Sequence, residues 1–182
     1  MGDAAGPRPR CGGAEGTMGD AVARFRDSWA ERRPDLDLSS MEVMGRVLRL
    51  AALMNQATEE GLAGSGVSRP EFEVLAALRR ASPSGLRPGR LTRETISSGA
   101  ATTKRLIRLE QAGLIARTPS ERDRREVDVR LTEAGAALID RLFAEQLERE
   151  AGILAPLPPA EREALAAALA AVLTPIDRAE GL

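Results

Sequence analysis

Residues 91–135 decide the fold, and they run LTRETISSGAATTKRLIRLEQAGLIARTPSERDRREVDVRLTEAG. The first six residues form a short helical pattern, which the sequence Ser-Ser-Gly then breaks. A second helical pattern covers about 100–112, with Leu106 and Leu109 on its apolar side and Gly113 as its C-terminal cap. Two helices joined by a tight turn that contains glycine predict a helix-turn-helix.

Two short strands are predicted directly after this pair of helices. Residues 114–118 are suited to a strand, and residues 127–131 alternate apolar and polar side chains, as a half-buried strand does. Between them, residues 119–126 are polar and include three arginines. A hairpin with a basic tip after a helix-turn-helix predicts a wing.

Further helices are predicted on both sides of this segment. Ser39 with Glu42, and Ser68 with Glu71, have the spacing of a capping box, which marks the start of a helix. Pro70 suits the first turn of the second of these helices.

Three amphipathic or apolar segments complete the helical pattern. Residues 21–33 predict a short amphipathic helix, and Thr132 is placed to cap a long helix that reaches about residue 152. Residues 159–173 are rich in Ala and Leu and predict a last helix.

The fold class that follows is mainly α with a small two-stranded β-wing, a winged helix-turn-helix with additional N- and C-terminal helices. Residues 1–19 are rich in Gly, Pro and Ala, and we expect a disordered tail there. We expect one domain over 20–182, made of N-terminal helices (20–60), the winged helix-turn-helix lobe (61–131) and C-terminal helices (132–182).

The composition excludes several kinds of catalytic site. The chain of 182 residues has no histidine and a single cysteine, which excludes a histidine base, most zinc sites and a disulfide within the chain. Glu71, Glu73 and Arg80 could form an acid–base site, but no Gly-rich phosphate loop, metal cluster or activated nucleophile accompanies them. We therefore expect no enzyme and no cofactor.

The apolar segments are too short to cross a membrane. The longest, residues 164–173, is far below the roughly 20 residues that a membrane-spanning helix requires. No apolar run follows the first basic residues, so we expect no signal peptide and a soluble, cytoplasmic protein.

The charges are distributed unevenly along the chain. The formal net charge is −1, yet residues 79–130 contain 13 Arg or Lys against 6 Asp or Glu. A basic face on an otherwise acidic body predicts double-stranded DNA as a partner. The alternative is a solvated charged surface with no partner.

The second helix and the wing contain the side chains that suit DNA. Hydroxyls near a helix N-terminus fit phosphate oxygens, and Arg or Lys one turn later can reach guanine edges in the major groove. Guanidiniums on the wing tip fit a minor groove, and we expect Asp123 to pair with a neighbouring arginine and shape the tip. The predicted DNA-binding residues are Ser97, Ser98, Thr102, Thr103, Lys104, Arg108, Arg122, Arg124 and Arg125.

The chain resembles the MarR family of winged-helix regulators from about residue 40 to 155. The helix end RLEQAGLI, the wing tip DRR and the return strand VRLTEAG carry this resemblance. It implies a homodimer in which terminal helices of two subunits interlock, here residues 20–33, 132–152 and 159–173. Two recognition helices would then enter successive major grooves of a pseudo-palindrome, about 34–36 Å apart.

A narrower resemblance concerns a small effector. Trp29 and the following RPDLDLSSMEVMGRV are similar to the urate-responsive, PecS-type branch of this family. That resemblance implies an effector site made of Trp29, Glu73, Arg80 and Arg105, with Glu73 where the branch usually has Asp. A tryptophan can stack on a flat heterocycle and two arginines can neutralise an anion. Alternatively, Trp29 is a core or dimer contact, Arg80 pairs with Glu73 and Arg105 contacts phosphate.

These patterns together predict a homodimeric repressor that binds a pseudo-palindromic operator and is released by a small anionic, urate-like or aromatic, ligand. Arg105 lies on the helix that would contact DNA, so a ligand that draws it inward must move that helix. The alternative is a winged-helix architectural protein that binds any duplex and has no effector.

Overall fold

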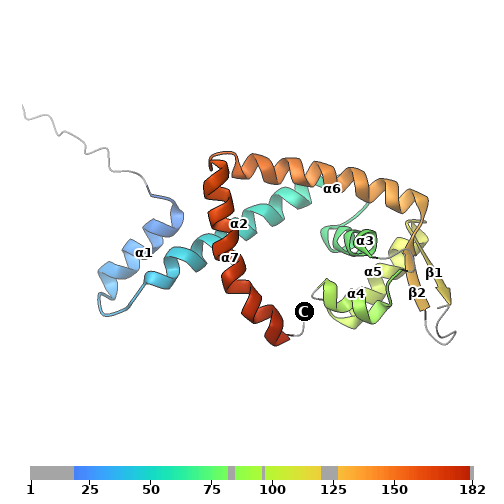
Figure 1. Ribbon diagram of the computed structural model, residues 1–182, viewed down its shortest axis with the longest axis horizontal. Coiled ribbons are helices and arrows are strands. Elements are labelled where there is room, and N and C mark those ends of the chain that lie inside the picture. Colours follow the sequence, from blue (N-terminus) through green and yellow to red (C-terminus); the bar gives the residue numbers. More distant parts are fainter. Residues whose placement is uncertain (1–18, 82–84, 96, 120–126, 181–182) are drawn as a thin grey trace, which may run out of the picture. The chain divides into compact units, whose positions relative to one another are not determined.

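The computed structural model describes residues 19–81, 85–95, 97–119 and 127–180. Contacts within the chain divide it into two units, residues 1–53 and 54–182, and the boundary between them falls within a helix. The elements, drawn in Figure 1, are α1 (Ala21–Arg32), α2 (Ser39–Gly61), α3 (Arg69–Arg80), α4 (Pro88–Glu94), α5 (Gly99–Gln111), β1 (Ile115–Pro119), β2 (Val127–Leu131), α6 (Glu133–Leu154) and α7 (Pro159–Glu180).

In the N-terminal unit, α1 packs closely on the first half of α2. Val22 is the buried residue of α1, and it lies against Gly45 of α2. A Cβ atom at position 45 would lie 2.6 Å from Cγ1 of Val22, so the two backbones approach this closely because residue 45 is a glycine.

Charged side chains hold the same two helices together. Glu42 of α2 accepts hydrogen bonds from Arg26 of α1 and from Arg46, and Arg46 also donates to Asp20 at 2.7 Å. Asp20 caps α1 by accepting from the backbone N–H of Ala23 at 2.9 Å. That backbone hydrogen bond, together with Arg46, lowers the pKa of the Asp20 carboxyl.

The start of α2 corrects one sequence prediction. The helix begins at Ser39, as expected, but the predicted capping box of Ser39 and Glu42 is wrong. The backbone N–H of Ser39 donates to Asp37 at 2.9 Å, while the carboxylate of Glu42 is bound to the two arginines.

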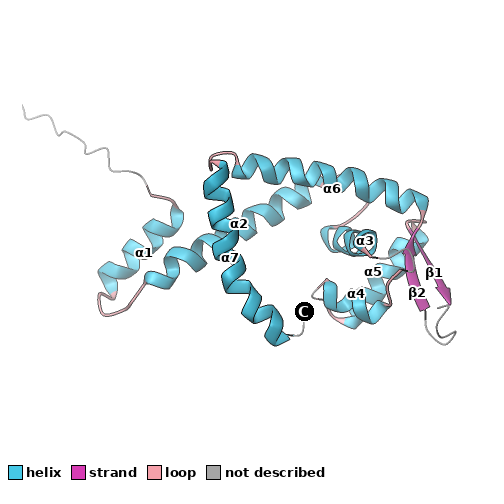
Figure 2. Cartoon of the chain, in the orientation of Figure 1, coloured by secondary structure: helices cyan, strands magenta, loops and turns pink. Residues whose placement is uncertain are grey.

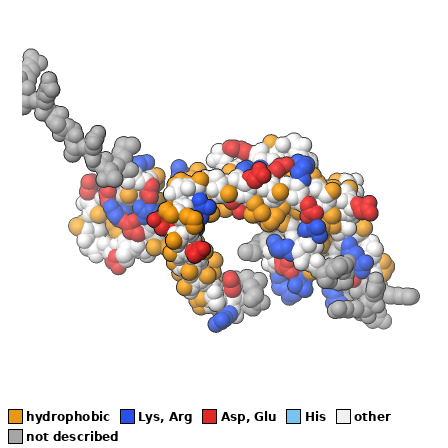
Figure 3. Space-filling model, turned by 45° about the horizontal axis from the view of Figure 1, so that its top comes forward, with side chains coloured by type: hydrophobic (Ala, Val, Ile, Leu, Met, Phe, Trp, Pro, Cys, Tyr) orange, Lys and Arg blue, Asp and Glu red, His pale blue; other side chains and the backbone are white. Residues whose placement is uncertain are grey.

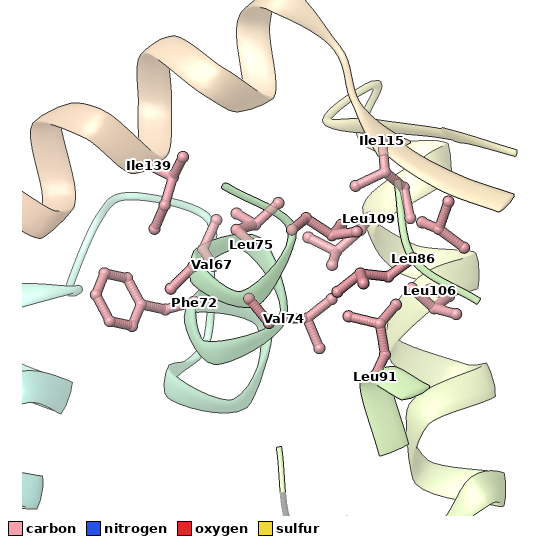
Figure 4. Close-up of a cluster of buried hydrophobic side chains, with 14 of the residues drawn as sticks. Val67, Phe72, Val74, Leu75, Leu86, Leu91, Leu106, Leu109, Ile115 and Ile139 are labelled. Atoms are coloured by element: carbon pink, nitrogen blue, oxygen red, sulfur yellow. The ribbon is translucent and has the colours of Figure 1, made fainter. Parts of the chain in front are cut away.

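The larger unit is built around α3. The side chains of Val74 and Leu75 are fully buried, and they converge with Leu91 of α4 and with Leu106 and Leu109 of α5 (Figure 4). The core is almost entirely aliphatic, as expected for a chain in which 2% of the residues are aromatic. This packing fixes the two helices of the helix-turn-helix against α3.

The helix-turn-helix is confirmed as α4 and α5. The first helix begins at Pro88, earlier than the sequence pattern indicated, because a proline is tolerated in the first turn, where its missing N–H leaves no bond unmade. Ser98 caps α5 by accepting from the backbone N–H of Ala101 at 3.3 Å. Gly113, with φ of 71°, follows the end of α5, where the left-handed backbone favours glycine.

The wing is an antiparallel pair of strands, β1 and β2 (Figure 2). Ile115 lies opposite Leu131 in the register of this pair. Leu86, in the segment before α4, exchanges two backbone hydrogen bonds with Val129 of β2, at 3.0 and 2.9 Å. The segment before the helix-turn-helix is therefore tied to the wing. The predicted fold class, mainly α with a two-stranded wing, is confirmed.

The helix α6 begins at a close junction with the wing. Thr132 accepts from the backbone N–H of Gly135 at 3.0 Å and donates to the carbonyl oxygen of Gly113 at 2.7 Å, which confirms it as the cap of α6. An ion pair between Arg79 of α3 and Asp140 of α6, with contacts of 2.7 and 3.0 Å, joins the two helices. The hydrogen bond from Arg79 lowers the pKa of the Asp140 carboxyl.

The last helix, α7, extends beyond the predicted end at 173 and includes Pro175. Hydrophobic side chains cover much of its surface, as Figure 3 shows. In the described part of the chain, no helix combines the length and the apolar character that a membrane crossing requires.

We expect Gly135→Ala to destabilise the winged lobe. A Cβ atom at position 135 would lie far inside van der Waals contact with the backbone carbonyl of Leu114, which cannot move without disturbing the start of β1. The expected loss is about 1–3 kcal/mol of unfolding free energy, measured by urea denaturation.

Gly152→Ala, in the same helix, is the matched control. A Cβ atom there would meet no atom within 4 Å, and alanine favours helix by about 1 kcal/mol over glycine. Equal stability of the two variants would contradict the close junction between α6 and Leu114.

Candidate nucleic-acid interface and ligand pocket

The outward face of α5 has a mixed polar and cationic character. Its buried side consists of Thr102, Leu106 and Leu109, which pack into the core. Because successive residues turn by about 100° around a helix, the opposite side presents Thr103 and Lys104, and both are exposed. Figure 3 shows Lys and Arg side chains gathered over the winged lobe.

The N-terminus of α5 can bind phosphate oxygens. The first backbone N–H groups of a helix have no partner within the helix, and they attract anions. Ser98 and Gly99 are exposed at this end, and the hydroxyl of Thr103 donates to the carbonyl oxygen of Gly99 at 2.9 Å. Ser98 and Thr103, two of the predicted DNA contacts, are therefore exposed at this end of α5.

Thr102 does not lie on that face. Its side chain is 1% exposed, and its hydroxyl donates to the carbonyl oxygen of Ser98 and accepts from Thr92 of α4, both at 3.1 Å. The hydroxyl thus joins the two helices of the helix-turn-helix. The prediction that Thr102 binds DNA is therefore wrong, because burial makes its side chain inaccessible to a duplex.

Arg108 is exposed but has a partner within the protein. Its Nε lies 3.4 Å from Oε1 of Glu71, a residue that is 3% exposed. The other oxygen of Glu71 accepts from the backbone N–H and the hydroxyl of Ser68, at 2.9 and 2.6 Å, in the predicted capping box of α3. A buried carboxylate at the start of α3 thus fixes the direction of Arg108.

The wing tip lies outside the described residues. Arg122, Asp123, Arg124 and Arg125 therefore remain sequence predictions. In the described part of the wing, Arg117 of β1 forms an ion pair of 3.1 Å with Glu110 at the end of α5.

A pocket of about 510 Å³ lies on the other side of α5, within the larger unit. Three of the four residues predicted to bind an effector line it, namely Glu73 and Arg80 of α3 and Arg105 of α5. The other lining residues are Arg69, Pro70, Phe72, Ala76, Glu94, Thr95, Ser97 and Phe143.

Four of the five charged side chains that line the pocket form ion pairs. Arg69 donates to Glu73 at 2.5 Å, and Arg80 lies 3.8 Å from Glu94, which also accepts from Arg90 at 2.8 Å. The alternative that Arg80 pairs with Glu73 is therefore wrong.

Arg105 is held by the turn of the helix-turn-helix. Its Nη1 donates to the hydroxyl of Ser97 at 2.5 Å, and Ser97 directly precedes the cap of α5. The hydroxyl of Ser97, predicted to contact DNA, is thus engaged on the pocket side.

Two phenylalanines form an aromatic wall that was not predicted from the sequence. The rings of Phe72 in α3 and Phe143 in α6 stack with centroids 6.4 Å apart and planes inclined by 19°. Only a weak sequence pattern could have indicated this aromatic contact. Phe143 follows Ile139 by one helical turn, but its neighbours depend on how α3 and α6 pack.

Trp29 belongs to the N-terminal unit and is 52% exposed on α1. It is therefore not a core residue of that unit. Its place relative to the pocket, and its alternative as a dimer contact, remain predictions.

The two neighbouring threonines of α5 provide a test of this interface. We expect Thr102→Val to lower the unfolding free energy by about 1 kcal/mol, because the bond between α4 and α5 is lost, and to leave DNA affinity nearly unchanged. Thr103→Val should do the reverse, with stability within about 0.5 kcal/mol of the parent and weaker DNA binding. Urea denaturation and fluorescence anisotropy measure the two effects. Weakened DNA binding confined to Thr102→Val would show that we have assigned the faces of α5 wrongly.

The chain is similar to known transcriptional regulators over most of its length. The model of the MarR family matches residues 65–126. The HTH-type transcriptional regulator PecS of Dickeya dadantii (strain 3937) is 39% identical over 152 residues, which are 83% of this chain and 92% of PecS. The HTH-type transcriptional repressor YetL of Bacillus subtilis (strain 168) is 25% identical over 125 residues, which are 69% of this chain and 75% of YetL.

Solved structures agree on the fold. AbsC, a MarR family transcriptional regulator from Streptomyces coelicolor, superposes with a TM-score of 0.69 at 22% identity, covering 81% of this chain and 98% of AbsC. With the identity to PecS over most of both chains, this chain belongs to the MarR family, and it is a DNA-binding transcriptional regulator and not an enzyme.

Proposed function

We propose that this regulator is a homodimeric repressor, which binds a pseudo-palindromic operator through α5 and the wing and leaves it when a small flat anion occupies the pocket. The position of α5 carries this proposal. One side of the helix presents Thr103 and Lys104 to solvent, and Arg105 of the same helix lines the pocket.

The assignment of α5 to the major groove rests on its chemistry. An exposed N-terminus with a serine cap suits phosphate, and Lys104 follows less than two turns later. The assignment as a repressor is supported by YetL, which its name describes as a repressor.

The dimer is supported by apolar side chains that the described residues leave exposed on the terminal helices. Exposed large hydrophobic residues of this kind are unusual unless a partner covers them. They are Phe25 and Trp29 of α1, Val43, Met44, Val47 and Leu48 of α2, Phe143, Leu147 and Ile153 of α6, and Leu165, Val172, Leu173 and Ile176 of α7.

The pocket suits an anion with a flat apolar body. Its volume of about 510 Å³ is within the range of small-molecule sites. Three arginines and two glutamates line it, so cations exceed anions, and the Phe72–Phe143 pair offers an aromatic wall. The contact of 3.8 Å between Arg80 and Glu94 is long for an ion pair, and a better placed ligand oxygen can replace it. Urate is one anion of this class.

The hydrogen bond from Arg105 to Ser97 couples the ligand pocket to the proposed DNA-binding face. A ligand anion that binds Arg105 competes with Ser97, and Ser97 lies in the turn that sets the start of α5. The ligand then favours the state of the dimer in which α5 has moved. Because linkage is reciprocal, DNA must weaken ligand binding by the same factor.

The first experiment measures fluorescence anisotropy of labelled DNA from upstream of the protein's own gene, with scrambled DNA as competitor. We expect tight binding that scrambled DNA does not displace. Lys104→Ala should weaken specific binding by about 5- to 150-fold, the range of one base contact, and binding to scrambled DNA by much less.

Arg141→Ala is the control, since Arg141 is an exposed cation of α6 that pairs with Glu145. Equal competition by scrambled DNA would overturn the operator-specific repressor in favour of an architectural protein. An equal loss on both DNAs in Lys104→Ala would make this lysine a phosphate contact.

The second experiment adds urate to the same complex. We expect urate to release the DNA from the parent protein, and Arg105→Gln to lose this response because the ligand then lacks its partner on α5. Arg141→Gln should respond as the parent does. Trp29→Phe should reduce the response and keep DNA affinity within about threefold. Specific DNA binding that urate leaves unchanged would reject urate as the effector.

A further inference from the structure

Ile107 is an apolar side chain on the outward face of the helix proposed to bind DNA. It is 43% exposed, whereas its neighbours Leu106 and Leu109 are almost fully buried. One turn away on the same face lie Thr103, Lys104 and Gln111, which are polar and exposed. Ile107 is not part of the buried core cluster, so the fold does not account for it.

The surroundings of Ile107 differ from those of the exposed hydrophobic residues of the terminal helices. Between α3 and the end of β2, the described residues contain only one other large exposed hydrophobic, Val127. A single isoleucine among cationic and hydroxyl side chains is too small a patch for a protein partner. The basic surroundings instead match the surface of a duplex.

We propose that Ile107 recognises the 5-methyl group of a thymine in the major groove. This inference rests on the proposed entry of α5 into that groove. The thymine methyl is an apolar group on an otherwise polar major-groove edge, and an aliphatic side chain is its natural contact. With cytosine or guanine at that position, Ile107 would displace water from the polar edge of the base and offer no hydrogen bond in its place.

The side chains beside Ile107 favour this contact. Lys104 lies three residues before it and is exposed on the same face, so a contact of this cation with the duplex holds Ile107 near the bases. An isoleucine in a helix is also restricted at χ1, so little rotamer freedom is lost on binding.

Replacement of thymine by uracil tests the proposal, since it removes the methyl group and keeps the base-pairing edge. A binding site is first selected with the full-length protein from a library of random duplexes. Each thymine of that site is then replaced in turn. At one thymine per half-site we expect uracil to lower the affinity of the parent protein about fourfold, the value of one buried methyl group.

Ile107→Ala should bind the thymine site more weakly than the parent and should no longer distinguish thymine from uracil at that position. Alanine is the better helix former, and residue 107 is outside the core, so urea denaturation should show unchanged stability. Leu36→Ala is the control, which removes an aliphatic side chain that is 42% exposed outside the winged lobe and should keep the parent's discrimination.

The outcomes separate this inference from the proposed function. If Ile107→Ala distinguishes thymine from uracil at every position as the parent does, the proposed role of Ile107 is wrong. The proposed repressor function would be unaffected by that result. A library that yields no preferred site would overturn the sequence-specific repressor itself, and with it the proposed thymine contact.

Discussion

The burial of α3 is the constraint on which the winged lobe depends. Its residues Val74 and Leu75 are inaccessible to solvent and contact the helix-turn-helix, while Arg79 and Phe72 reach α6. The same helix contributes Glu71, whose buried carboxylate pairs with Arg108 of α5. The helix α3 therefore supports both the outward face of α5 and the pocket. A displacement of α3 would change the position of α5 and the geometry of the pocket together.

Much of the lobe could be predicted because its signals are local. Ser98 and Thr132 cap helices through backbone groups three residues away, and Gly113 adopts a backbone conformation that few other residues tolerate. The alternation over 127–131 depends only on the two-residue period of a strand. Such local patterns can be recognised in the sequence because they do not depend on how distant parts of the chain pack.

The predictions that were wrong or missing depended on partners far along the chain. Glu42 has the spacing of a capping residue, but Arg26 of another helix binds its carboxylate. Phe143 meets Phe72 across 71 positions of sequence, so no local pattern indicated the aromatic wall. Thr102 is different, since it lies one turn before Leu106 and shares its buried face, which the helical period alone could have shown.

Lys104 is exposed on α5, and it is the one lysine of a chain in which all other cationic side chains are arginine. Lys104 therefore carries the only side-chain amine of the chain, and the proposed DNA contact covers that amine. Acetylation would remove one charge from α5 and alter no other side chain. An amine-reactive probe would likewise act as a footprinting reagent for that surface. Its labelling rate at Lys104, measured separately from that of the terminal α-amine, would report whether the helix is covered or open to solvent.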